Sequence, residues 1–117
     1  MKRDMELCRK IRFRIEEDTS GRPISDLKIE GYSAEDINYN CKLLYQEGFV
    51  EDYTPYFRSQ YSVGQLTWEG HDFLDKVREE TVWNRIKEAV AQKGATLTFE
   101  IIKSVAPSII SSMITGI

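Results

Sequence analysis

The stretch from Gly31 to Val50, GYSAEDINYNCKLLYQEGFV, constrains the fold of this chain more than any other segment. Ser33 stands where a helix would begin, and its hydroxyl can accept an unpaired amide of the first turn. Glu35 and Asp36 follow in that turn, where negative charge suits the helix dipole. Three apolar side chains then recur at helical spacing: Ile37, Cys41 and Leu44. The pattern predicts a capped amphipathic helix from Ser33 to Glu47.

The end of this helix is marked by a glycine, and extended runs follow it. Gly48 supplies the left-handed backbone conformation that commonly ends a helix. Residues 49–53 and 61–66 have the composition of two strands, and Pro55 lies in the loop between them. A helix that ends at a glycine and leads into such a hairpin closes the helix-turn-helix core of many winged-helix domains. The hairpin would be the wing.

The other segments extend this prediction over the whole chain. Lys2 to Asp18 has the pattern of a first helix, and Ile24 to Glu30 that of a short strand. Three more helices are expected after Thr67, over Val82–Lys93 and after Thr98. The predicted fold is α+β, mainly α: a winged helix-turn-helix over residues 1–80, with a C-terminal helical extension over 81–117. A second helix before the central one is missing or very short, which departs from the usual three-helix arrangement.

The aromatic and sulfur side chains are expected in the core. Trp68 and Trp83 stand at helix starts with the spacing of core anchors. Cys8 and Cys41 each fall on a predicted buried helix face, so we expect two inert thiols and no disulfide. No charged segment followed by an apolar one opens the sequence, and no apolar run reaches spanning length, which predicts a cytoplasmic protein without membrane contact.

The charges are unevenly distributed along the 117 residues. Residues 1–14 carry six bases and two acids, whereas residues 15–56 carry three bases and ten acids. The predicted central helix therefore lies in the acidic section. Since duplex binding draws much of its affinity from neutralising phosphates, this distribution weighs against a DNA contact there. The bases of the first helix, Lys2, Arg3, Arg9, Lys10 and Arg14, could contact a phosphate backbone without reading sequence. We expect instead a solvated face, paired to the nearby acids Glu16, Glu17 and Asp18.

Three segments of the chain resemble, in order, one known family. They are MKRDMELCRKI at residues 1–11, EGYSAEDINYNCKLLYQEGFV at 30–50 and LTWEGHDFLDKVREETVWNRIKE at 66–88. The family comprises bacterial and phage proteins and is catalogued as a domain of unknown function. The resemblance implies a phage or prophage setting and a winged helix, but no activity, substrate or catalytic residue. Members often have Tyr-His where this chain has Tyr39-Asn40, so no histidine role carries over.

Two binding hypotheses follow for the central helix and the hairpin. In the first, the helix reads double-stranded DNA, with Asn38, Tyr39, Lys42 and Gln46 facing the groove and Arg58 of the hairpin on a phosphate. The same ridge would also suit a solvated surface. In the second, the chain binds a protein, because two adjacent aromatic residues at a loop tip, Tyr56 and Phe57, suit an interface core. The wide apolar stripe of the last helix, with Ile110 and Ile114, suits packing on the first helix, a homodimer seam or a protein partner.

An enzyme is not expected. His71 is the single histidine, and its neighbours Asp72 and Asp75 have no second histidine, nucleophile motif or glycine-rich phosphate loop beside them. The two cysteines are far apart in sequence and give no metal-ligand spacing. We therefore expect no catalytic residue, no metal and no cofactor.

Overall fold

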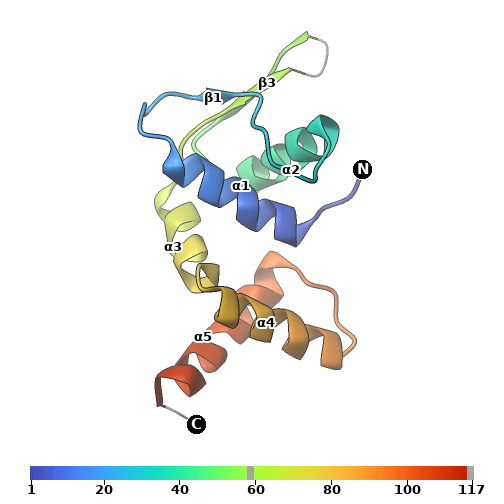
Figure 1. Cartoon of the computed structure of the whole chain (residues 1–117), viewed down its shortest axis with the longest axis vertical. Helices are drawn as coiled ribbons and strands as arrows, with labels where there is room; N and C mark the ends of the chain where they lie inside the picture. Colours follow the sequence, from blue (N-terminus) through green and yellow to red (C-terminus); the bar gives the residue numbers. More distant parts are fainter. Residues whose placement is uncertain (58–59, 116–117) are drawn as a thin grey trace. The chain divides into compact units, whose positions relative to one another are not determined.

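The computed structural model describes residues 1–57 and 60–115. Over these residues the chain is α+β and mainly helical, with five helices and three short strands (Figure 1). It divides into two compact units, Met1–His71 and Asp72–Ile117. No helix in the described part of the chain combines the length and apolar character that crossing a bilayer requires.

The first unit is built on helices α1 (Met5–Glu17) and α2 (Ala34–Gln46). The Asp4 side chain caps α1 by accepting the Leu7 amide at 3.0 Å. Ser33 caps α2 in the same way, accepting the Asp36 amide at 3.1 Å. Gly48, with φ of 79°, follows the last turn of α2. The predicted helix from Ser33 to Glu47 is therefore confirmed, with both of its end signals.

A small antiparallel sheet joins segments that are distant in sequence. Its strands are β1 (Ile24–Ser25), β2 (Tyr53–Pro55) and β3 (Tyr61–Val63), in the order β1-β3-β2. Val63 is paired with Ile24 on one side and with Tyr53 on the other. A bridge between Val50 and Leu66 continues the hairpin toward α2. The β2–β3 hairpin thus follows α2 and extends away from it (Figure 1).

The predicted strand from Ile24 to Glu30 is wrong beyond its first two residues. Asp26 has a positive φ of 50°, which turns the chain out of the sheet. Its carboxylate accepts the Tyr61 amide at 3.2 Å, so the turn is held against β3. Leu27 then enters the core, with 4% of its surface exposed. Residues 26–33, all of them described, form a loop that contains no helix.

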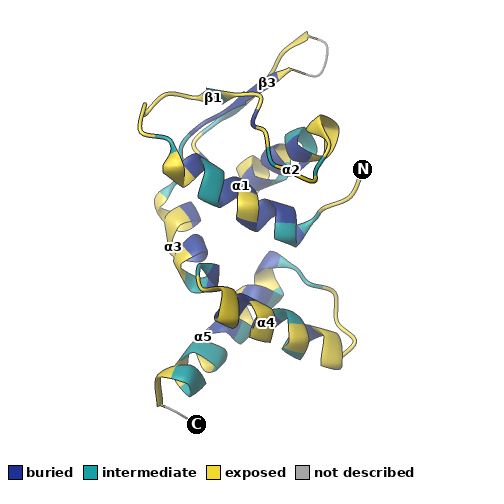
Figure 2. Ribbon diagram, viewed as in Figure 1, coloured by how far each residue is buried: buried dark blue, intermediate teal, exposed yellow. Residues whose placement is uncertain are grey.

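The core of the first unit lies between α1, α2 and the sheet, where buried positions line the facing sides of the two helices (Figure 2). The buried stripe of α2 is the predicted one: Ile37, Cys41 and Leu44 are at most 2% exposed. Cys8 and Cys41 are both buried free thiols, as expected. Burial raises the pKa of each thiol to about 12, which keeps both neutral and unreactive near neutral pH.

Helix α3 (Trp68–Val77) begins against the end of α2. The Thr67 hydroxyl accepts the Gly70 amide at 3.0 Å, as expected for a cap, and donates to the Gly48 carbonyl at 2.6 Å. A Cβ at Gly70 would lie 2.1 Å from the carbonyl oxygen of Phe49. The helix therefore starts at a point where only glycine permits the close approach of two backbones.

The second unit contains α4 (Glu80–Gln92) and α5 (Phe99–Thr115), which pack on each other. Trp83 is 1% exposed and anchors this unit, as predicted. The Phe73 and Phe99 rings meet edge to face, with centroids 5.5 Å apart. The core assignment of Trp68 is wrong, because its side chain is 84% exposed.

Candidate functional site

The outward face of α2 carries three of the five residues predicted to contact DNA: Tyr39, Lys42 and Gln46. Glu35, Lys42 and Gln46 are exposed and Tyr39 is half-buried, on the side opposite the buried stripe. We call these four residues the outer ridge. The exposure of Lys42 and Gln46 makes an ammonium and a carboxamide available to a partner.

Asn38 borders the outer ridge and is tied to the hairpin. Its side-chain oxygen accepts a hydrogen bond from the hydroxyl of Tyr53 on β2. Burial raises the pKa of Tyr53, so this hydroxyl keeps its proton and remains a donor at neutral pH. Asn38 therefore fixes the hairpin against one flank of α2, a positioning role that the sequence pattern did not indicate.

Asn40 occupies the other flank and was missed as a functional residue. It is 0% exposed, and its side-chain oxygen accepts the Asp4 amide at 2.9 Å and the Cys8 thiol at 3.4 Å. Its amide group donates to the carbonyls of Asp36 at 2.9 Å and Lys2 at 3.3 Å. The signal in the sequence was its spacing, three residues after Ile37 and one turn before Leu44, which places it at the edge of the buried stripe. Asn40 holds residues 2–4 beside α2.

The basic face predicted for α1 is smaller than expected. Arg9 is buried, and its guanidinium lies 4.8 Å from the centre of the Phe13 ring. Arg12 is also buried, 4.8 Å from the Phe49 ring centre, and burial lowers its pKa to about 10. Aromatic faces accept these planar cations, so the helix can bury both groups, and Arg9 is buried where a solvated face was expected. The exposed bases at this end of the chain are Lys2, Arg3 and Lys10.

The hairpin presents aromatic side chains to solvent. Tyr56 is 56% exposed and Phe57 is 81% exposed. The Tyr56 hydroxyl lies 3.4 Å from the hydroxyl of Ser62 across the hairpin, which holds its ring near β3. Arg58, the predicted phosphate contact, lies outside the described residues.

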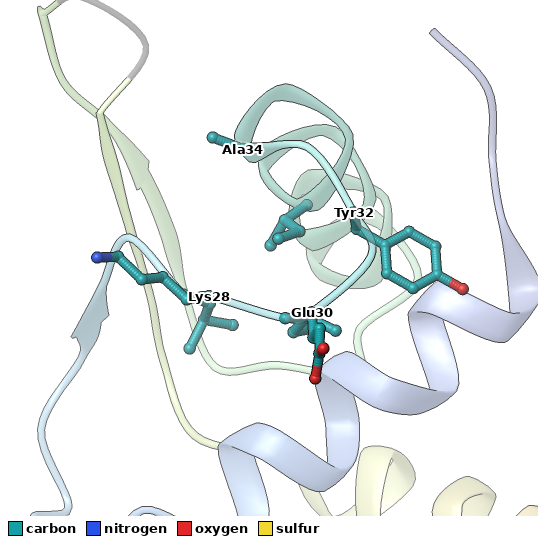
Figure 3. Close-up of a pocket in the computed structure, with 7 residues that line it drawn as sticks. Lys28, Glu30, Tyr32 and Ala34 are labelled. Carbon is teal, nitrogen blue, oxygen red and sulfur yellow. The ribbon is translucent and has the colours of Figure 1, made fainter.

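A hollow of about 360 Å³ lies between the loop that precedes α2 and the start of α2 itself (Figure 3). Its lining is mainly apolar and comprises Leu27, Lys28, Ile29, Glu30, Tyr32, Ala34 and Ile37. The polar ends of Lys28, Glu30 and Tyr32 point in three different directions, and the Lys10 ammonium lies 5.3 Å from the Tyr32 ring centre. Because ligand sites need convergent polar groups, this hollow does not form a chemically defined site.

The cluster around His71 consists of surface groups. His71 is exposed. Asp72 pairs with Lys76 at 3.2 Å and Asp75 pairs with Arg78 at 3.0 Å. Within the part of the chain that the structure describes, no group of three or more His, Cys, Asp or Glu side chains is arranged to hold a metal ion.

The last helix exposes part of its apolar stripe. Phe99, Ile102 and Ala106 are buried within the second unit, whereas Ile110 is half-buried and Ile114 is 79% exposed. The final turns of α5 therefore present apolar surface.

Comparison with known proteins gives a family. A family model described as "Hypothetical protein (DUF2513)" matches residues 2–96. A protein of Haemophilus influenzae that bears the name "Uncharacterized protein" is 36% identical over 117 residues, covering 97% of this chain and 99% of its own length. No solved structure matches the chain. The extent of the family match, together with this full-length relative, shows that the chain belongs to the DUF2513 family.

Proposed function

We propose that this chain is a phage- or prophage-type regulator whose first unit is a winged helix that binds double-stranded DNA through the outer ridge of α2. The order of elements supports this fold: α1, β1, α2 and then the β2–β3 hairpin, with β3 paired to both other strands. In helix-turn-helix proteins the second helix of the motif lies in the major groove, which is about 12 Å wide and admits one helix. Here α2 would take that role.

The observation that carries the proposal is how α2 is flanked. Asn38 and Asn40 are two residues apart, which is about 200° around a helix, so they lie on opposite flanks of α2. Asn38 binds the hairpin through Tyr53, and Asn40 binds residues 2–4. The outer ridge lies between these two attachments, on the side away from the core. A helix with a chain segment on either flank suits a duplex, whose backbones border the groove on both sides.

The charges favour the second half of α2 for the groove contact. Glu35 and Asp36 are exposed in the first turn, where they stabilise the helix but repel phosphate. Lys42 and Gln46 lie about two and three turns beyond Glu35. A lysine suits guanine or phosphate, and a glutamine suits the edge of adenine. We therefore assign Lys42 and Gln46 the central contacts and Tyr39 a border contact.

A salt series with random duplex DNA tests the proposal. Because binding releases counterions from phosphates, the logarithm of affinity should fall linearly with the logarithm of salt concentration, by about 0.9 for each neutralised phosphate. Undetectable binding at low salt would contradict the proposal.

A charge reversal tests the site itself. Lys42→Glu should abolish duplex binding without changing thermal stability, because Lys42 is exposed. Arg85→Glu makes the same charge change at an exposed position of α4, in the second unit, and should retain binding. Normal duplex binding by Lys42→Glu would show that the outer ridge is not the surface that contacts DNA.

The exposed hairpin tip favours one rival function, a protein-interaction module for a host or phage protein. Exposed aromatic residues are enriched at interface cores, and Phe57 is 81% exposed. Protein binding becomes the better supported of the two functions if the wild-type chain binds no duplex at low salt. A pull-down with wild-type bait should then retain a partner that Phe57→Ser bait loses. Equal retention by both baits would exclude the hairpin tip as the binding surface.

The end of α5 supports self-association as a companion to DNA binding. Ile114 is exposed and Ile110 half-buried, so a second copy would cover apolar surface that water now contacts. Closed twofold dimers are the commonest protein oligomers, and a dimeric regulator binds two half-sites. We propose a homodimer through α5.

A further inference from the structure

The segment before α1 is fixed in place although it belongs to no helix or strand. Asp4 is held at both its backbone and its side chain: its amide donates to Asn40, and its carboxylate caps α1. Two residues earlier, the Lys2 carbonyl accepts the amide group of Asn40. We call residues 2–4, with the exposed bases Lys2 and Arg3, the basic arm. Figure 1 shows this segment running past α2.

The residue that fixes the arm is a buried amide on a different element. Asn40 also donates to the Asp36 carbonyl within α2 and accepts from the Cys8 thiol on α1, so α1, α2 and the arm converge on one side chain. A fully buried carboxamide requires partners for its donors and its acceptor, and the arm backbone provides two of them. The arm position is therefore determined by the core.

The backbone of the arm is bound to α2, whereas its charged side chains face solvent. The side chains of Lys2 and Arg3 are exposed, while the Lys2 carbonyl and the Asp4 amide are bound to Asn40 of α2. That flank is the one away from the hairpin, and the exposed Asp36 lies between Asn40 and the outer ridge on the helix surface. The two positive charges are therefore available to a partner that approaches the outer ridge from this flank.

We infer that the basic arm is a second binding site for the phosphate backbone of duplex DNA, held in register with the outer ridge by Asn40; this inference rests on the proposed function. In a complex with α2 in the groove, the arm would meet the phosphate backbone on the flank of α2 away from the hairpin. Guanidinium and ammonium groups are the usual phosphate contacts, and such contacts set orientation without reading sequence. Since the arm is already ordered in the free protein, binding does not have to order it.

The test compares salt dependence between the wild-type chain and Lys2→Ser/Arg3→Ser. Random duplex DNA is the probe for both. Removing two phosphate contacts should reduce the slope of log affinity against log salt by about 2, at about 0.9 per phosphate. A matched control, Arg85→Ser/Lys93→Ser, removes two exposed bases of the second unit and should keep the wild-type slope.

A double-mutant cycle tests the part played by Asn40. Asn40→Ala frees the arm, so it should weaken duplex binding in the wild-type background and have no further effect in Lys2→Ser/Arg3→Ser. Equal weakening in both backgrounds would show that Asn40 does not act through the arm. Should Asn40→Ala fail to fold, the surface variant Lys2→Ser/Arg3→Ser still decides whether the arm binds phosphate.

The outcomes separate the two proposals. A wild-type chain that binds no duplex at low salt overturns the proposed function. A wild-type chain that binds duplex with the same slope as Lys2→Ser/Arg3→Ser overturns the arm inference and leaves the function intact. A slope reduced only in the arm variant supports both.

Discussion

At the residue scale, the two tryptophans have the same side chain in opposite environments. Trp83 is 1% exposed and Trp68 is 84% exposed. Trp83→Ala should lower the free energy of unfolding by about 3–5 kcal/mol, because it removes a large buried ring. Trp68→Ala should change it by less than about 0.5 kcal/mol. Urea unfolding measures both, and equal losses for the two variants would contradict the assignment of their environments.

The sequence contained the information needed to place Trp68 outside. Trp68 precedes Gly70 by two residues, about 200° around the helix, and Gly70, Phe73, Leu74 and Val77 are the buried positions. The prediction of a core position for Trp68 relied on its residue type, a large aromatic, and not on its place around the helix. Helix periodicity would have placed Trp68 on the exposed face.

The buried polar residues of the first unit were not predictable in this way. Arg9 was expected on a solvated face but is buried over Phe13, one turn away on the same helix. Arg12 is buried over Phe49, which a distant segment supplies. Asn40 is bonded to Asp4 and Lys2, which lie 36 and 38 positions earlier in the chain. The contacts of Arg12 and Asn40 with distant segments exist only once the chain packs, so local periodicity does not contain them.

At the element scale, the junction between α2 and α3 depends on one hydroxyl. Thr67 caps α3 and also bonds the Gly48 carbonyl at the end of α2. Thr67→Val keeps the shape and loses both hydrogen bonds, so it should lower the free energy of unfolding by about 1–2 kcal/mol. Thr67→Ser retains the hydroxyl and serves as the control. If chemical denaturation finds the two variants equally stable, the hydroxyl does not hold this junction.

The elements themselves were largely predictable, and the strands were less so. Helix ends carry local signals, such as Ser33, Gly48 and Thr98, whose hydroxyl accepts the Ile101 amide at 3.1 Å. The end of β1 has no such signal, because the turn at Asp26 is held by a hydrogen bond to Tyr61, 35 residues away. The outer ridge was predictable from helix periodicity, whereas its attachment to the hairpin through Asn38 was not.

At the scale of the whole molecule, self-association is the proposed role of α5. The wild-type chain should sediment as a dimer, and Ile114→Lys should sediment as a monomer, because a charge would replace exposed apolar surface in the seam. Glu88→Lys introduces the same side chain at an exposed position of α4 and should remain dimeric. A wild-type chain that is monomeric at every concentration would exclude this seam.

The central claim is that the outer ridge of α2 and its flanks meet duplex DNA. Its most direct test is a map of backbone amide NMR shifts during titration with random duplex at low salt. We expect the largest changes on Lys2, Arg3, Tyr39, Lys42 and Gln46, and we expect them to reverse as salt rises. No change at low salt, or changes confined to α4 and α5, would contradict it.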